Sequence, residues 1–135
     1  SRLKTMNSRP QAWFKQAKDD LEVAKLTRDN GYNCQACYFA SQAAEKALKG
    51  LILELGAEPA YTHVLGELIK QLKQLGCNVE AFDSLPLSSL SRLAAASRYP
   101  IEATPAAELF EPADANQAIS TAAAVLELVE ALDTP

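Results

Sequence analysis

Residues 33–55 constrain the fold more than any other part of the sequence, because they predict one long helix with a continuous packing seam. Small or apolar side chains recur there at alternating steps of three and four, at Cys34, Cys37, Ser41, Ala44, Leu48, Leu51 and Leu55. On a helix of 3.6 residues per turn, this spacing puts them on one face. Alanines beside the seam allow a second helix to approach closely. The segment therefore indicates a helical bundle.

Four other segments carry the same helical spacing, and short connections separate most of them. They are residues 10–29, 62–75, 86–97 and about 112–132. Ser8 and Thr62 are expected to act as N-caps, whose side-chain oxygens accept a backbone N–H. Because short connections make neighbouring helices antiparallel, the sequence predicts an all-α fold, an up-and-down four-helix bundle with an additional short helix. Residues 10–133 are expected to form this single domain, and residues 1–9 to be disordered or derived from a tag.

Net charge and hydropathy limit the classes of partner. The 135 residues carry a formal net charge of −4, and an acidic domain lacks the broad positive field that drives non-specific nucleic-acid binding. A local basic groove is still compatible with that charge. No apolar run approaches the roughly 20 residues needed to span a membrane, so we expect no membrane partner. No signal peptide is recognisable, and a cytoplasmic location is expected.

Three cysteines raise the question of a metal or redox site. Cys34 and Cys37 form a Cys-x-x-Cys pair, which in some proteins binds metal or exchanges disulfides. A zinc site needs two further ligands, and only Cys77 and His63 are available. The pair also occupies core-facing positions of the predicted helix. We therefore favour buried structural cysteines in a reducing compartment, with no metal and no cofactor.

The polar stripe of residues 33–55 supplies the first candidate for ligand binding. Lys46 and Lys49 lie three residues apart and project from the same side of the predicted helix. Two ammonium groups in this arrangement can hold a phosphate. The alternative is an ordinary solvated helix face, in which Glu45 and Lys49 pair at i,i+4.

His63, Arg98 and Tyr99 supply the other candidates. His63 is predicted at the start of a helix, where it can contact a phosphate or a base edge, or simply hold the loop by a hydrogen bond. Arg98 and Tyr99 precede Pro100, which fixes the backbone of Tyr99 outside the helical region. Together they can bind phosphate and stack on a base, whereas the alternative role of Arg98 is to stabilise a helix C-terminus. No standard catalytic motif is present, and a triad built on His63 has little support.

These pieces, in this order, resemble the HEPN family. They are an opening with Trp13, Ala17 and Leu21, a Gln-Ala-Ala-Glu-Lys-Ala-Leu-Lys string that ends at Lys49, the pair Thr62-His63, and Arg98-Tyr99-Pro100. The resemblance covers nearly the whole chain. It implies a four- or five-helix bundle that commonly forms a homodimer, a nucleotide-binding role, and partnership with a minimal nucleotidyltransferase, often as a toxin–antitoxin-like pair.

Many HEPN proteins are RNases that carry an Arg followed, after four to six intervening residues, by a His. Here the single histidine, His63, precedes Arg92 and Arg98, so that motif is absent. Val64 also stands where the family usually has Asp after Thr-His.

The resulting prediction is a non-catalytic HEPN protein with no catalytic residues, which acts as a nucleotide-binding or accessory subunit of a nucleotidyltransferase. Its binding residues would be Lys46, Lys49, His63, Arg98 and Tyr99, and its ligand a nucleotide or RNA. Two alternatives are a divergent dimeric RNase using Arg98 and His63, and a homodimeric assembly module without a ligand.

Overall fold

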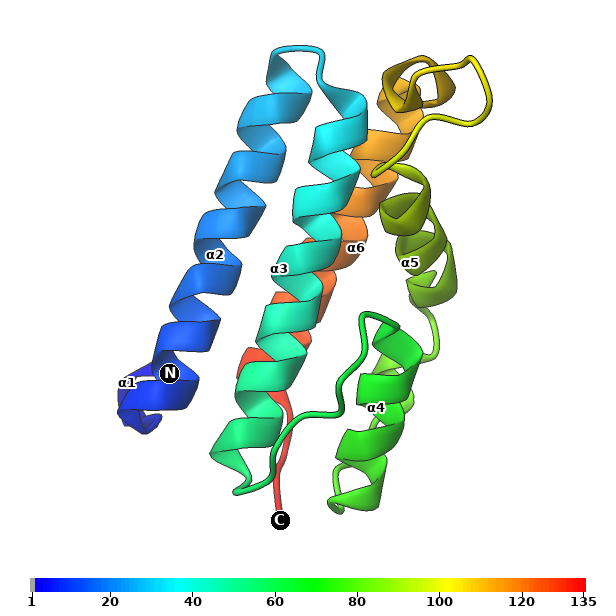
Figure 1. Cartoon of the computed structure of the whole chain (residues 1–135). Coiled ribbons are helices and arrows are strands. Elements are labelled where there is room, and N and C mark those ends of the chain that lie inside the picture. Colours follow the sequence, from blue (N-terminus) through cyan, green and yellow to red (C-terminus); the bar gives the residue numbers. More distant parts are fainter. Residues whose placement is uncertain (1) are drawn as a thin grey trace.

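In the computed structural model, which describes residues 2–135, the chain is built from α-helices (Figure 1). The helices are α1 Arg2–Thr5, α2 Ser8–Asp29, α3 Asn33–Glu54, α4 Leu65–Gln74, α5 Leu87–Ala96 and α6 Pro112–Ala131, with 3-10 turns η1 Glu80–Phe82 and η2 Ala106–Leu109. Within the described residues the only β-type pairing is an isolated bridge between Ile101 and Thr104. The predicted all-α fold is confirmed. None of the helices formed by residues 2–135 is long and apolar enough to cross a membrane.

Helix α3 lies at the centre of the bundle and contacts α2, α4, α5 and α6 (Figure 1). Its seam is buried from Cys34 to Leu51, as the spacing predicted, whereas Leu55, just after the helix, is only partly buried. The alanines at positions 36, 40, 43, 44 and 47 are fully buried. Burial of large side chains such as Leu48 and Leu51 stabilises the fold by roughly 1.5–3 kcal/mol each. The helix is thus the central scaffold of the bundle.

Helices α2 and α3 approach each other closely at Gly50. A Cβ atom added to Gly50 would lie 3.3 Å from the carbonyl oxygen of Pro10 and 3.3 Å from the Cβ of Trp13. A side chain at this position would therefore push the first turns of α2 away from α3. The absence of a side chain at Gly50 therefore allows the first turns of α2 to pack against α3.

The N-terminal segment is described from residue 2 onward. Residues 2–5 form α1, Met6 is buried in the core, and the Arg2 guanidinium donates to the carbonyl oxygen of Leu132 at the end of α6. These contacts order the segment, because an apolar side chain and a backbone acceptor both hold it. Helix α2 starts at Ser8, with Asn7 as the N-cap and no side-chain capping bond, so the predicted cap at Ser8 is wrong. Ser1 lies outside the described residues, and a tag origin for the segment stays a prediction.

Helix α4 also begins later than predicted. The Thr62 hydroxyl accepts the backbone N–H of Val64 at 3.0 Å within a turn that precedes the helix. Val64, with extended backbone angles, is the N-cap, and the helix starts at Leu65. Thr62 is therefore a turn residue, because its hydroxyl bonds two residues ahead instead of capping a helix. His63 consequently lies in the loop between α3 and α4.

Candidate functional site

A cleft beside α3 brings together three of the five predicted site residues. A cavity of about 520 Å³ is lined by His63, Arg98 and Tyr99 together with Tyr38 and Gln42 of α3. An adjoining cavity of about 290 Å³ shares Gln42, His63, Arg98 and Tyr99, and also reaches Ser41, Glu45 and Ser91. The loop before α4, the polar stripe of α3 and the segment after α5 thus meet at one place. We call the two adjoining cavities the α3 cleft.

Glu45, which lines the α3 cleft, contacts two basic side chains. The Nδ1 atom of His63 lies 2.9 Å from Oε1 of Glu45, and Nζ of Lys49 lies 3.1 Å from Oε2 of the same carboxylate. Glu45 is only 5% exposed. Each of its two carboxylate oxygens contacts a protein group instead of water. The predicted pair between Glu45 and Lys49 is present, but the Lys49 side chain is only 12% exposed. This pair is therefore part of the interior rather than of a solvated face.

The α3 cleft also contains an arginine and two tyrosines. The guanidinium carbon of Arg98 lies 5.5 Å from the centre of the Tyr38 ring, which is a cation–π arrangement. Tyr99 is 71% exposed at the rim. Among residues 2–135, no carboxylate lies within ion-pair distance of the Arg98 side chain. Its charge is thus available to an anion that enters the cleft.

Lys46 lies outside this arrangement. Its Nζ atom is 2.5 Å from Oδ2 of Asp20, whose other oxygen accepts a hydrogen bond from Gln16 at 3.0 Å. Lys46 lines a separate pocket with Ala12, Trp13 and Gln16. Lys46 and Lys49 therefore engage different carboxylates and do not converge as a phosphate clamp. Lys49 reaches the α3 cleft only through Glu45.

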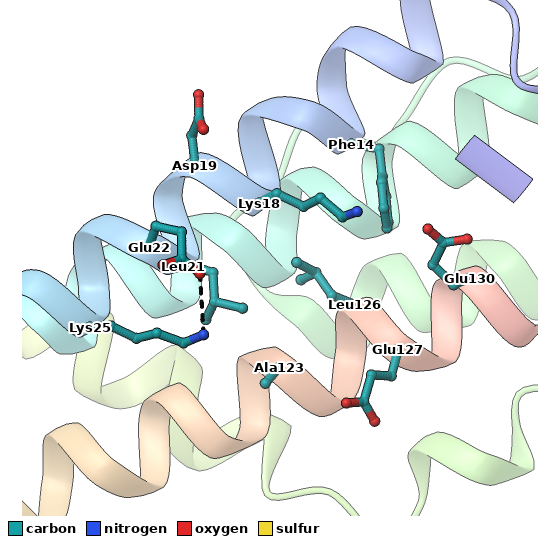
Figure 2. A pocket seen from close by; sticks show the side chains of 10 residues that line it. All are labelled: Phe14, Lys18, Asp19, Leu21, Glu22, Lys25, Ala123, Leu126, Glu127 and Glu130. Carbon is teal, nitrogen blue, oxygen red and sulfur yellow. Dashed lines mark hydrogen bonds and ion pairs between the residues drawn. The ribbon is translucent and has the colours of Figure 1, made fainter. Parts of the chain in front are cut away.

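A larger cavity of about 600 Å³ lies between α2 and α6 (Figure 2). Phe14, Leu21 and Leu126 form its floor, and Lys18 lies over the Phe14 ring at 5.6 Å. Its other charged residues are Asp19, Glu22, Lys25, Glu127 and Glu130. Four carboxylates against two lysines give this cavity a negative balance, which disfavours a phosphate. The α3 cleft, which contains Arg98, is the better candidate for an anionic ligand.

The cysteines belong to the core. All three are free and buried, and burial raises the pKa of Cys37 to about 12, with the charge of Asp114 and the neighbouring Cys34 adding to the shift. Burial also raises the pKa of Cys34 and of Cys77. Such thiols stay protonated at neutral pH and react slowly. In the described part of the chain, no group of three His, Cys, Asp or Glu side chains could hold a metal ion.

Sequence reasoning missed Tyr38 and Gln42 as cleft residues. Both precede Glu45 on α3, at steps of four and three, so helical spacing alone would have placed them on the same stripe as Glu45. Arg92, by contrast, donates to Ser88 of its own helix at 2.9 Å and is exposed.

Comparisons with known proteins agree with this architecture. The model of the HEPN domain family matches residues 10–132, and the chain therefore belongs to the HEPN family. TT1696 from Thermus thermophilus is 32% identical to it, over 93% of this chain and 98% of that one, with a TM-score of 0.80. ST0689, an archaeal HEPN homologue, is 29% identical over 90% of this chain and 95% of its own, with a TM-score of 0.69.

A third solved structure is an HEPN domain protein from Thermotoga maritima, 24% identical over 89% of this chain and 95% of its own, with a TM-score of 0.68. At that identity it supports the fold alone. A comparison with curated proteins gave no match.

Proposed function

We propose that this HEPN protein binds a nucleotide or a short RNA in the α3 cleft and has no catalytic role of its own. The observation that carries the proposal is the joint lining of this cleft by Arg98, His63 and Tyr99. Arg98 offers a planar cation whose N–H groups fit a phosphate. Tyr99 offers an exposed ring on which a base can stack.

The local charge of the α3 cleft supports an anionic ligand in spite of the acidic chain. Arg98 already stacks on Tyr38, so its guanidinium is held in place before a ligand arrives. Pre-organisation of this kind lowers the entropy cost of binding. Calorimetric titration of the whole chain with ATP, GTP and a short single-stranded RNA tests the proposal, and at least one of them is expected to bind.

We further propose that the protein works as a homodimer and as the accessory subunit of a minimal nucleotidyltransferase, in a toxin–antitoxin-like pair. Support comes from the HEPN fold and from the sequence resemblance described above. The test is co-purification of the untagged chain with a tagged nucleotidyltransferase from the same genome. Failure of the two proteins to associate when produced together would contradict the partnership and leave the nucleotide site untouched.

A second candidate function is RNA cleavage by a divergent arrangement. The observation that favours it is that Arg98 and His63 line one cleft within a single protomer, although the family's Arg-to-His spacing is absent. Incubation of single-stranded RNA with the wild type and with Arg98→Ala decides between the two functions. Cleavage that disappears in the variant would establish the RNase, whereas intact RNA with measurable binding supports the non-catalytic proposal.

A further inference from the structure

His63 combines an exposed ring with a buried partner, which is an unusual arrangement for a surface histidine. Its side chain is 64% exposed, whereas the Glu45 carboxylate that contacts it is 6% exposed. A carboxylate taken out of water loses solvation that its protein partners must replace. Glu45 has two such partners, His63 and Lys49. Through this contact the buried carboxylate holds the Nδ1 edge of an exposed imidazole.

The contact determines which ring nitrogen faces a ligand. Glu45 accepts hydrogen bonds, so the Nδ1 atom at 2.9 Å carries the hydrogen. Lys49 donates to the other oxygen of the same carboxylate, so Glu45 has a hydrogen-bond donor on each oxygen. In a neutral ring with hydrogen on Nδ1, the Nε2 atom is an acceptor. The two ring nitrogens point away from each other, so Nε2 is the atom left to contact a molecule in the α3 cleft.

We propose that Glu45 is a positioning residue that fixes His63 in the Nδ1–H form and so presents Nε2 to the ribose 2′-hydroxyl of the bound ligand. A neutral ring nitrogen accepts from an O–H group and does not attract a phosphate oxygen. Arg98, which lines the same cleft, serves the phosphate. The α3 cleft thus takes a ribonucleotide in preference to a deoxyribonucleotide. The ligand part of this inference rests on the proposed function, and the tautomer part stands without it.

The tautomer can be read directly, because His63 is the single histidine in the chain. Two-bond nitrogen–proton correlation spectra of the ¹⁵N-labelled protein, recorded with the ring neutral, give one set of imidazole signals. We expect the Nδ1–H pattern in the wild type and a mixed pattern in Glu45→Leu, which removes the acceptor at similar volume. Glu127→Gln, a carboxylate of the α2–α6 cavity, is the matched control and should keep the wild-type pattern. A wild-type Nε2–H pattern would overturn the proposal, even where Glu45→Leu does not fold.

The ligand claim is tested by calorimetry with ATP and dATP, which differ only in the 2′-hydroxyl. A site built around a hydroxyl discriminates against the analogue that lacks it. We expect the wild type and Glu127→Gln to bind ATP about tenfold more tightly than dATP, and Glu45→Leu to lose this preference. Equal affinities in the wild type would overturn the ribose claim while the nucleotide site survives. Absence of binding by either nucleotide would overturn the ribose claim together with nucleotide binding, and the spectra would still decide the role of Glu45.

Discussion

The Nζ atom of Lys46 lies 2.5 Å from the Oδ2 atom of Asp20, and this contact ties α3 to α2. The Asp20 side chain is buried, whereas the Lys46 side chain is one-quarter exposed. Loss of one partner from such a pair leaves the other without compensation, and the cost is greater for the more buried group. Removal of Lys46 should therefore destabilise the fold more than removal of the charge of Asp20.

Lys46→Met is expected to destabilise the protein more than Asp20→Asn. The first variant leaves a buried carboxylate with only Gln16 as a donor, and we expect it to lower the free energy of unfolding by about 1–3 kcal/mol. In the second, the ammonium group can turn to solvent. Urea unfolding of both variants measures the difference, and Lys15→Met, on an exposed position of α2, is the control. Equal losses would contradict the asymmetry.

Lys46→Met also tests the role in phosphate binding that the sequence predicted for Lys46. Because Lys46 lines a different pocket from Arg98, we expect the nucleotide affinity of this variant to stay within about twofold of the wild type, once folding is confirmed by circular dichroism. A loss of affinity comparable to that of Arg98→Ala would restore Lys46 to the binding site.

Gly50 is expected to tolerate substitution poorly. Gly50→Leu places a large side chain against the Pro10 carbonyl and Trp13, and overpacking of this kind costs about 1–3 kcal/mol. Gly66→Ala is the matched comparison, because nothing lies within 4 Å of an added Cβ there. It should stabilise α4 by about 0.5–1 kcal/mol, since alanine is the better helix former. Thermal melts of the two variants should move in opposite directions.

Protein stability should fall at alkaline pH through Cys37. Its pKa is raised from 9.0 to about 12 by burial, so the folded state favours the neutral thiol. The corresponding stability is complete below pH 9 and is lost as the pH rises toward 12. Urea unfolding across this window should show a steeper decline for the wild type than for Cys37→Ala. Parallel declines would argue against a buried neutral thiol.

The helices themselves could be predicted from the sequence, because local spacing determines them. The seam of α3 and the start of α6 at Pro112 agree with the structure. The start of α4 could not be read in the same way, since Thr62 fits either an N-cap or the turn that it forms. Local patterns do not distinguish these two uses of a hydroxyl.

The candidate site was only partly predictable, because its contacts join distant segments. Glu45 has the spacing of an exposed helix residue, but in the folded chain it is buried and contacts His63 of the loop between α3 and α4. The pairing of Lys46 with Asp20 likewise depends on how α2 packs against α3. Arg98 and His63 could be named from the sequence, but their shared cleft follows from the tertiary fold.

Assembly is tested by light scattering coupled to size-exclusion chromatography. The proposed homodimer should elute with twice the 14.6 kDa mass of the chain at micromolar concentration. A monodisperse monomer at that concentration would contradict the dimer, without bearing on the cleft of each protomer.

The most direct test of nucleotide binding in the α3 cleft compares two arginine variants by calorimetry. Arg98 lines the cleft, whereas Arg92 is exposed on α5 and contacts Ser88 of the same helix. With the nucleotide or RNA that the wild type binds, Arg98→Ala should lose at least tenfold in affinity, as expected for removal of a phosphate contact. Arg92→Ala should bind as the wild type does. Equal affinities for both variants and the wild type would contradict a nucleotide site in this cleft.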